Sequence, residues 1–253
     1  MKIVSVLLAM MALLLCDAAL AASAVVTSLT GNVQVQSGAG AARTLRQGDE
    51  VVQGDTVFTG AASSVVLKFD DGQVAALTAN SRMQVTAYAY DPGSRHGNIL
   101  LSLVVGGMRA ITGLIGHNQP SNVNFRAATA TIGIRGSEGS IVTDGTSVSI
   151  TVTDGAFTFT YAGDTITIPA GRGAFGADGK ITQGTIQEIF DRLPPAFRDA
   201  LGGLEGLENA INNARPGEQR PGAGTGSTGT PGNNTPSGGG GNTGPGGGPA
   251  SRQ

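Results

Sequence analysis

The chain has 253 residues, a formal net charge of −2 and a pI of about 5.6, so it is long enough for one or two domains. Apolar residues make up 40% of the chain, aromatic residues only 4%, and tryptophan is absent, which predicts a core of Val, Ile, Leu and Ala. The slightly acidic charge and the lack of a basic run argue against a nucleic-acid partner.

The N-terminus has the three sections of a secretory signal: Lys2, an apolar run over residues 3–15, and Ala-Leu-Ala at 19–21. We therefore expect a signal peptide at residues 1–21 that is cleaved before Ala22, and no transmembrane span after cleavage, since the apolar run is short for a bilayer. Cys16 is an alternative lipoprotein acceptor, but a bulky leucine precedes it. Cleavage at Ala21 would leave no cysteine, and hence no disulfide or thiolate site.

Residues 22–184 are predicted to form an all-β domain. Val65, Leu67 and Phe69 alternate with the outward positions Val66, Lys68 and Asp70. Val148 and Ile150 likewise alternate with Ser149 and Thr151 on a face expected to be wet, and this period of two is typical of a strand with one buried face. Short strands with turn signals at intervals of about ten residues indicate a sandwich, barrel or roll. The turn pairs that carry this spacing are Gly48-Asp49, Gly54-Asp55, Asp71-Gly72, Asp154-Gly155 and Gly163-Asp164.

Gly48-Asp49, Gly54-Asp55 and Thr59-Gly60, with further motifs in order, resemble the FecR domain, the periplasmic part of bacterial FecR-type regulators of iron–siderophore uptake. The resemblance covers roughly residues 30–140. It rests on Leu67-Lys68-Phe69-Asp70-Asp71-Gly72, Leu101-Ser102-Leu103, Gly106-Gly107-Met108-Arg109, Phe125, and Ala130-Thr131-Ile132-Gly133-Ile134-Arg135-Gly136-Ser137. The chain departs from the family at Ala127-Ala128, where Thr-Pro is frequent, and at Ser137, where Thr is frequent. The resemblance implies an elongated, twisted β-roll or solenoid-like fold.

From residue 185 the apolar period changes to three and four, which predicts short amphipathic helices over 185–214, broken at Pro194-Pro195. Gly202, Gly203 and Gly206 weaken the second helix, so it needs contacts with other parts of the protein or with a partner. Either the helices cap an open end of the β domain or they dock to another protein.

Residues 215–253 are rich in glycine and proline and contain no Val, Ile, Leu or aromatic residue. Such a segment cannot bury enough apolar surface to offset the entropy of ordering it. We therefore expect a disordered tail.

Candidate ligand sites are few, and we predict no catalytic, cofactor-binding or metal-binding residues. Gly171 to Gly176 has the spacing of a phosphate-binding turn, but a β-type segment follows where that turn needs a helix, which predicts a hairpin loop. His96 and His117 stand alone beside turn residues, without a second ligand at metal spacing.

The acidic pairs Asp49/Asp55 and Asp70/Asp71 offer oxygen ligands for calcium, although they lack EF-hand spacing and fit plain turn chemistry. Arg135 lies between two glycines in an otherwise apolar run. It either pairs with a turn aspartate inside the domain or contacts a partner.

The sequence thus predicts a non-enzymatic protein-binding or sensory module of the bacterial envelope, periplasmic or secreted, whose partner is an envelope protein of unknown identity. The resemblance implies a link to iron–siderophore signalling. A structural, surface-associated protein with a spacer tail is the alternative. A polysaccharide-active enzyme ranks last, because such enzymes usually line their cleft with aromatic residues and this chain has no tryptophan and only three tyrosines.

Overall fold

The computed structural model describes residues 23–215, apart from the side chain of Arg135. The predicted signal peptide and the predicted tail beyond residue 215 lie outside the described residues. The strands are β1 (Ala24–Thr30), β2 (Val33–Ser37), β3 (Arg43–Thr44), β4 (Glu50–Val51), β5 (Asp55–Thr59), β6 (Ser64–Phe69), β7 (Val74–Leu77), β8 (Arg82–Asp91), β9 (His96–Ile111), β10 (Val123–Ala127), β11 (Ala130–Thr143), β12 (Val148–Tyr161), β13 (Asp164–Pro169), β14 (Arg172–Ala177) and β15 (Lys180–Thr185). The helices are α2 (Leu114–Asn118), the 3-10 turn η1 (Pro120–Asn122), α3 (Ile186–Arg192), α4 (Pro195–Glu205) and α5 (Glu208–Ala214).

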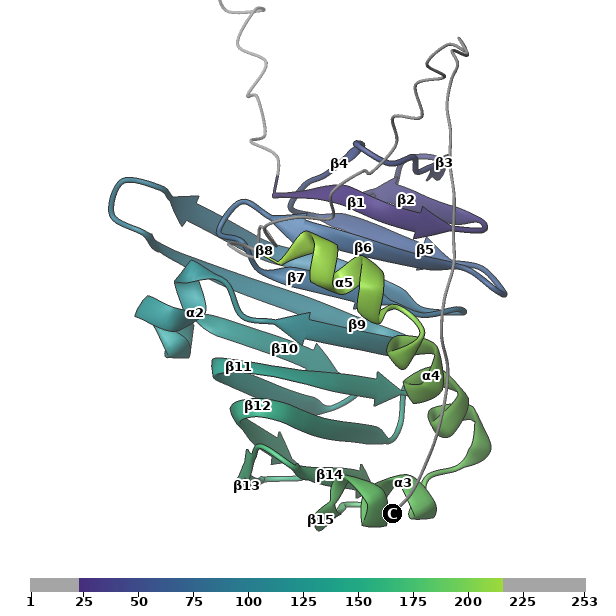
Figure 1. Cartoon of the computed structure of the whole chain (residues 1–253), viewed down its shortest axis with the longest axis vertical. Coiled ribbons are helices and arrows are strands. Elements are labelled where there is room, and N and C mark those ends of the chain that lie inside the picture. Colours follow the sequence, from purple (N-terminus) through teal and green to yellow (C-terminus); the bar gives the residue numbers. More distant parts are fainter. Residues whose placement is uncertain (1–22, 216–253) are drawn as a thin grey trace, which may run out of the picture. The chain divides into compact units, whose positions relative to one another are not determined.

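The strands pair into one continuous sheet that is arranged as two layers (Figure 1). Layer 1 has the order β4-β1-β6-β7-β9-β11-β12-β14-β15. Layer 2 has the order β3-β2-β5-β8-β9-β10-β11-β12-β13. The long strands β9, β11 and β12 appear in both orders, so they join the two layers.

Each shared strand changes layers at a glycine with positive φ. The first half of β9 pairs with β8 and β10, and its second half pairs with β7 and β11. The change falls at Gly106, where φ is +101° and an added Cβ would lie 2.5 Å from the Cα of Ser81. Gly136 and Gly155 do the same for β11 and β12, with φ of +57° and +68°. Glycine therefore provides the backbone conformation at each crossing, and it also permits the close approach at Gly106 and Gly155.

The main core lies between the layers and is built from the inward positions of their strands. Val65, Leu67 and Phe69 belong to it, as do Val148 and Ile150, which confirms the predicted alternation. Its largest fully buried side chains include Phe69, Phe125, Phe157 and Phe159.

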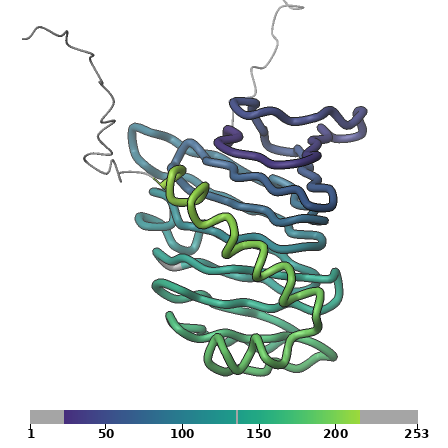
Figure 2. Tube along the Cα trace, turned by 45° about the vertical axis from the view of Figure 1, so that its right-hand side comes forward, coloured from purple at the N-terminus to yellow at the C-terminus, as the bar shows by residue number. Residues whose placement is uncertain are grey.

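The outer face of layer 1 is also buried, which the strand pattern did not predict. Val66 on β6 and Ser149 on β12 were expected to face water, yet each is only 1% exposed. Helices cover this face: α3 packs against β14 and β15, α4 against β9 and β11, and α5 against β1, β6 and β7 (Figure 2). The chain thus returns along layer 1 from its last strands to its first.

The C-terminal helices begin and end where the sequence gives a physical reason. Thr185 caps α3 in a capping box with Glu188, and α4 begins at Pro195, after the predicted break. The second predicted helix is in fact two, because α4 ends at Glu205 and Gly206 separates it from α5. The helices lie along a face of the sheet, so they do not cap an open end of it.

The all-β class with a short C-terminal helical segment is confirmed. Among the described helices, none combines the length and the apolar character needed to cross a membrane.

Candidate functional site

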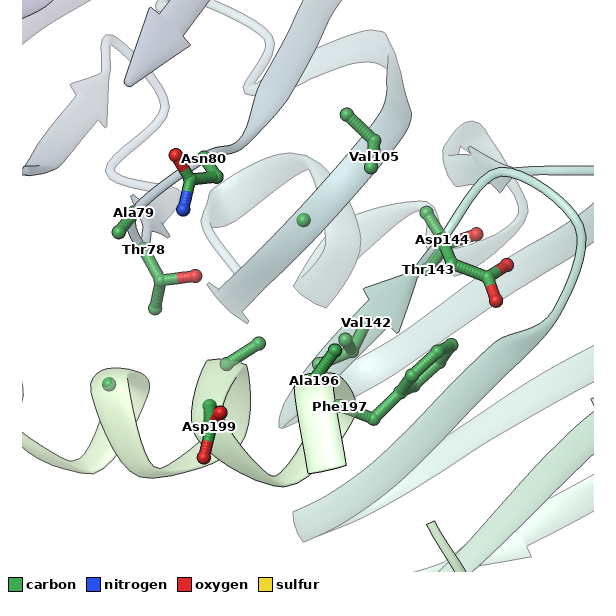
Figure 3. Close-up of a pocket in the computed structure, with 13 residues that line it drawn as sticks. Thr78, Ala79, Asn80, Val105, Val142, Thr143, Asp144, Ala196, Phe197 and Asp199 are labelled. Atoms are coloured by element: carbon green, nitrogen blue, oxygen red, sulfur yellow. The ribbon is translucent and has the colours of Figure 1, made fainter. Parts of the chain in front are cut away.

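A pocket of about 340 Å³ lies between α4 and the side of layer 1 where β7 and β11 end (Figure 3). We call it the α4 pocket. Its strand side comes from the segment after β7, the middle of β9 and the end of β11, and its helix side from one stripe of α4. The lining residues are Thr78, Ala79, Asn80, Val105, Gly106, Val142, Thr143, Asp144, Ala196, Phe197, Asp199, Ala200 and Gly203.

The helix side of the α4 pocket follows from the spacing of α4. Ala196, Asp199, Ala200 and Gly203 recur at three and four residues, so they share one stripe of the helix. The adjacent stripe carries the buried side chains that hold α4 on the sheet: Phe197, Leu201 and Leu204. The small residues leave the space that larger side chains would fill.

A charged cluster fastens α5 to layer 1. Arg109 on β9 donates to Glu138 on β11 and, through Nη1, to Oε2 of Glu208 on α5 at 2.7 Å. Arg215, just after α5, donates to the other oxygen of Glu138 at 2.6 Å. The side chain of Glu138 is 9% exposed and that of Arg109 13%, so the centre of this cluster is nearly dry.

A second buried carboxyl group lies at the β6–β7 turn. Asp71 is 1% exposed and accepts hydrogen bonds from the backbone amides of Gln73 and Ile115 and from the hydroxyl of Tyr88. Burial raises the pKa of Asp71, and these hydrogen bonds only partly oppose that effect. Burial also raises the pKa of Tyr88, with a further contribution from the charge of Asp71. The group holds the start of α2 against the turn.

The raised pKa of Asp71 predicts a pH effect on stability. The unfolded chain releases this proton near pH 3.8, before the folded chain does, so the contribution of Asp71 to stability is present below that pH. It is lost as the pH rises through the folded-state pKa. In urea unfolding between pH 3 and 7, we expect the wild type to lose stability relative to Asp71→Asn as the pH rises. Parallel curves for the two proteins would contradict this assignment.

The structure places the acidic candidates for calcium in turns. Asp49 accepts from Arg43 and from the backbone amide of Arg46, and Asp55 accepts from Ser37 and from the amide of Val52. These are the capping contacts of turn aspartates. Within residues 23–215, no group of three or more His, Cys, Asp or Glu residues is arranged to hold a metal ion.

The other candidates are dispersed over the fold. His96 begins β9 and His117 lies in α2. The prediction of a hairpin loop at residues 171–176 is wrong for most of that segment, because β14 begins at Arg172, and only Gly171, with φ of +78°, lies in the turn. The backbone of Arg135 pairs with Ala156. Its side chain is not among the described parts, so its role stays a prediction.

The α4 pocket and the charged cluster were missed by sequence reasoning. The pocket is assembled from four separate segments, and Arg109 and Glu208 are 99 positions apart. The one available signal was the helical period after residue 185, which predicted that some surface must cover the helices.

These features define an all-β domain with one helix-covered face and a small pocket beneath the helices. Residues 55–157 match the model of the family described as FecR protein. This match confirms the resemblance to the FecR domain over that part of the chain. The match runs from β5 into β12, so helices α3 to α5 and the helix side of the pocket lie outside it.

Comparison with solved structures gives two crystal structures, at 1.65 and 2.50 Å, of a proposed anti-sigma factor from Parabacteroides distasonis ATCC 8503. Their sequence identities are 13% and 12%, and their TM-scores 0.43 and 0.44. Each match covers 51% of this chain and 59% of the other, so the chain spans less than two thirds of that protein. No curated protein gives a significant sequence match.

Proposed function

We propose that the protein is a non-enzymatic sensory or regulatory module of the bacterial envelope that acts by binding another protein. The observation that carries this proposal is the FecR domain at residues 55–157. The partner is an envelope protein, and a link to iron–siderophore signalling follows from the FecR-type regulators that the sequence resembles. The fold of the present protein, with long strands shared between two layers, offers a rigid support for a binding surface.

The proposal includes export by the signal peptide at residues 1–21 and a periplasmic or secreted location. The glycine- and proline-rich segment from residue 216 would then act as a spacer, which also suits the alternative of a surface-associated structural protein. Both layers add their strands nearly in chain order, from β4 or β3 at one end to β15 or β13 at the other. On this ground we propose that the domain is a solenoid-like roll.

Two surfaces are suited to a partner, and the α4 pocket is the first. The second is the edge strand β13, which pairs with β12 and has no other partner among the described strands. Its exposed Thr165 and Thr167 alternate with inward isoleucines, so a partner strand could add to its free edge. Pro169, at its end, would limit the length of that pairing.

Site-specific photo-crosslinking in the native envelope tests the proposal. We expect a discrete crosslinked protein with a photoreactive residue at position 199 or 165, and none at the exposed position 209 on α5. A product from 199 would indicate the α4 pocket, and one from 165 would indicate strand addition. Equal labelling at all three positions, or none, would contradict a protein-binding role.

A further inference from the structure

The α4 pocket combines an apolar floor with an acidic rim. Val142 and Phe197 are each 2% exposed and form part of the floor. Asp144 and Asp199 are exposed; Asp144 lies on the strand side of the pocket, after β11, and Asp199 lies on α4 (Figure 3). No lysine, arginine or histidine lines the pocket, and neither aspartate forms an ion pair with any described residue.

The rim stays negatively charged at neutral pH. Partial burial raises the pKa of Asp144, but hydrogen bonds from the amides of Ser147 and Thr146 and from the Thr146 hydroxyl outweigh it, so the pKa is lower than usual. These contacts, of 2.7 to 2.8 Å, also fix the carboxylate in the turn after β11. The side chain of Asp199 forms no hydrogen bond within the described part of the chain, so its carboxylate can meet a ligand without losing a contact.

We propose that the α4 pocket accepts a lysine or arginine side chain from a partner polypeptide. The aliphatic stem would lie on Val142 and Phe197, and the cationic head would reach the carboxylates of the rim. Such side chains bury their stems against apolar surface while the charged end stays near water. The volume of about 340 Å³ is at the lower end for ligand pockets, which suits one side chain. This inference rests on the proposed protein-binding function.

The preference for a positive charge is confined to the α4 pocket. An adjoining depression shares Asn80 and Val105 with the pocket but is lined by Arg82. An acidic partner group would therefore be drawn towards Arg82 and repelled from the α4 pocket. This arrangement specifies a basic group on the partner at this one position.

Small analogues of the two side chains test the inference without the partner. The probes are n-butylguanidinium and n-butylammonium, with n-butanol and n-butyrate as neutral and anionic controls of similar length. In NMR titrations of the ¹⁵N-labelled protein, we expect both cations to shift the amide signals of Gly106 and Ala200. Butanol should bind about fivefold more weakly, since an exposed ion pair contributes no more than that. Butyrate binding as well as either cation would overturn the proposal.

Matched variants test whether the two rim aspartates are responsible for cation binding. Asp144→Asn and Asp199→Asn should each weaken cation binding by up to about fivefold, whereas Glu205→Gln, an equal charge change on the exposed face of the same helix, should leave it unchanged. Ala196→Phe, at an exposed lining position, should block butanol and the cations alike. Cation binding that survives both aspartate variants would overturn the proposal, as would binding that survives Ala196→Phe.

These outcomes are separable from the crosslinking result. A crosslinked partner at position 199 without any cation preference would support the protein-binding function and contradict a lysine or arginine side chain as the group that the pocket binds. Cation binding without a crosslinked partner would support the preference of the pocket for a cation and contradict the protein-binding function.

Discussion

Glu138→Gln should lower the free energy of unfolding by about 3–5 kcal/mol, because it removes the shared carboxylate from two partly buried arginines. Arg109 and Arg215 are 13% and 26% exposed and both donate to Glu138. Among the described residues, Arg109 would keep only the half-exposed Glu208 as a counterion, and Arg215 would have none. Urea unfolding measures the loss, and limited proteolysis should show faster cleavage at α5, which this cluster fastens.

Two controls separate the buried charge from the contact itself. Glu208 is 45% exposed, so Glu208→Gln should cost at most about 1 kcal/mol. The double variant Arg109→Met with Glu138→Leu replaces the buried pair by apolar side chains and should recover the part of the loss that comes from Arg109, whereas Arg215 stays without its carboxylate. If the Glu138 and Glu208 variants were equally stable, the cluster would contribute no more than a surface ion pair.

Phe157→Ala should cost about 3–5 kcal/mol, because it opens a cavity in the core between the layers. Phe157 has no exposed surface and lies in the half of β12 that belongs to layer 2. Thermal or urea unfolding of the purified variant measures this loss.

Phe58→Ala is the matched control. Phe58 lies on β5, also in layer 2, and is only partly buried. Its truncation should cost clearly less than that of Phe157. A larger loss at Phe58 would contradict the position of the core between the layers.

The sequence was sufficient for the strands and their inward faces, because the period of two in Val65 to Phe69 reports local geometry directly. It also located the helices through their period and the proline pair. The sequence could not predict which outward face of the sheet would be covered by helices. Val66 packs against α5, and the neighbours of Ser149 on adjacent strands, Val142 and Phe175, pack against α3 and α4. These helices lie far along the chain, and no local pattern records such a contact.

The sequence predicted less of the candidate site than of the fold. Asp49 and Asp55 could be assigned as turn residues because their contacts are close in sequence. The charged cluster joins positions 77 and 99 residues apart, and the α4 pocket exists only where β7, β9, β11 and α4 meet. Only tertiary structure brings these groups together.

The return of the chain along layer 1 also sets an order for folding. Val66, Val74 and Ala76 on the first strands are covered by α5, the last helix of the described chain. During synthesis this apolar face must therefore wait until residue 214 is available. Contacts between such distant segments close slowly, because the entropy of closing a long loop comes before any gain from packing. In that interval the incomplete sheet exposes apolar surface that favours aggregation.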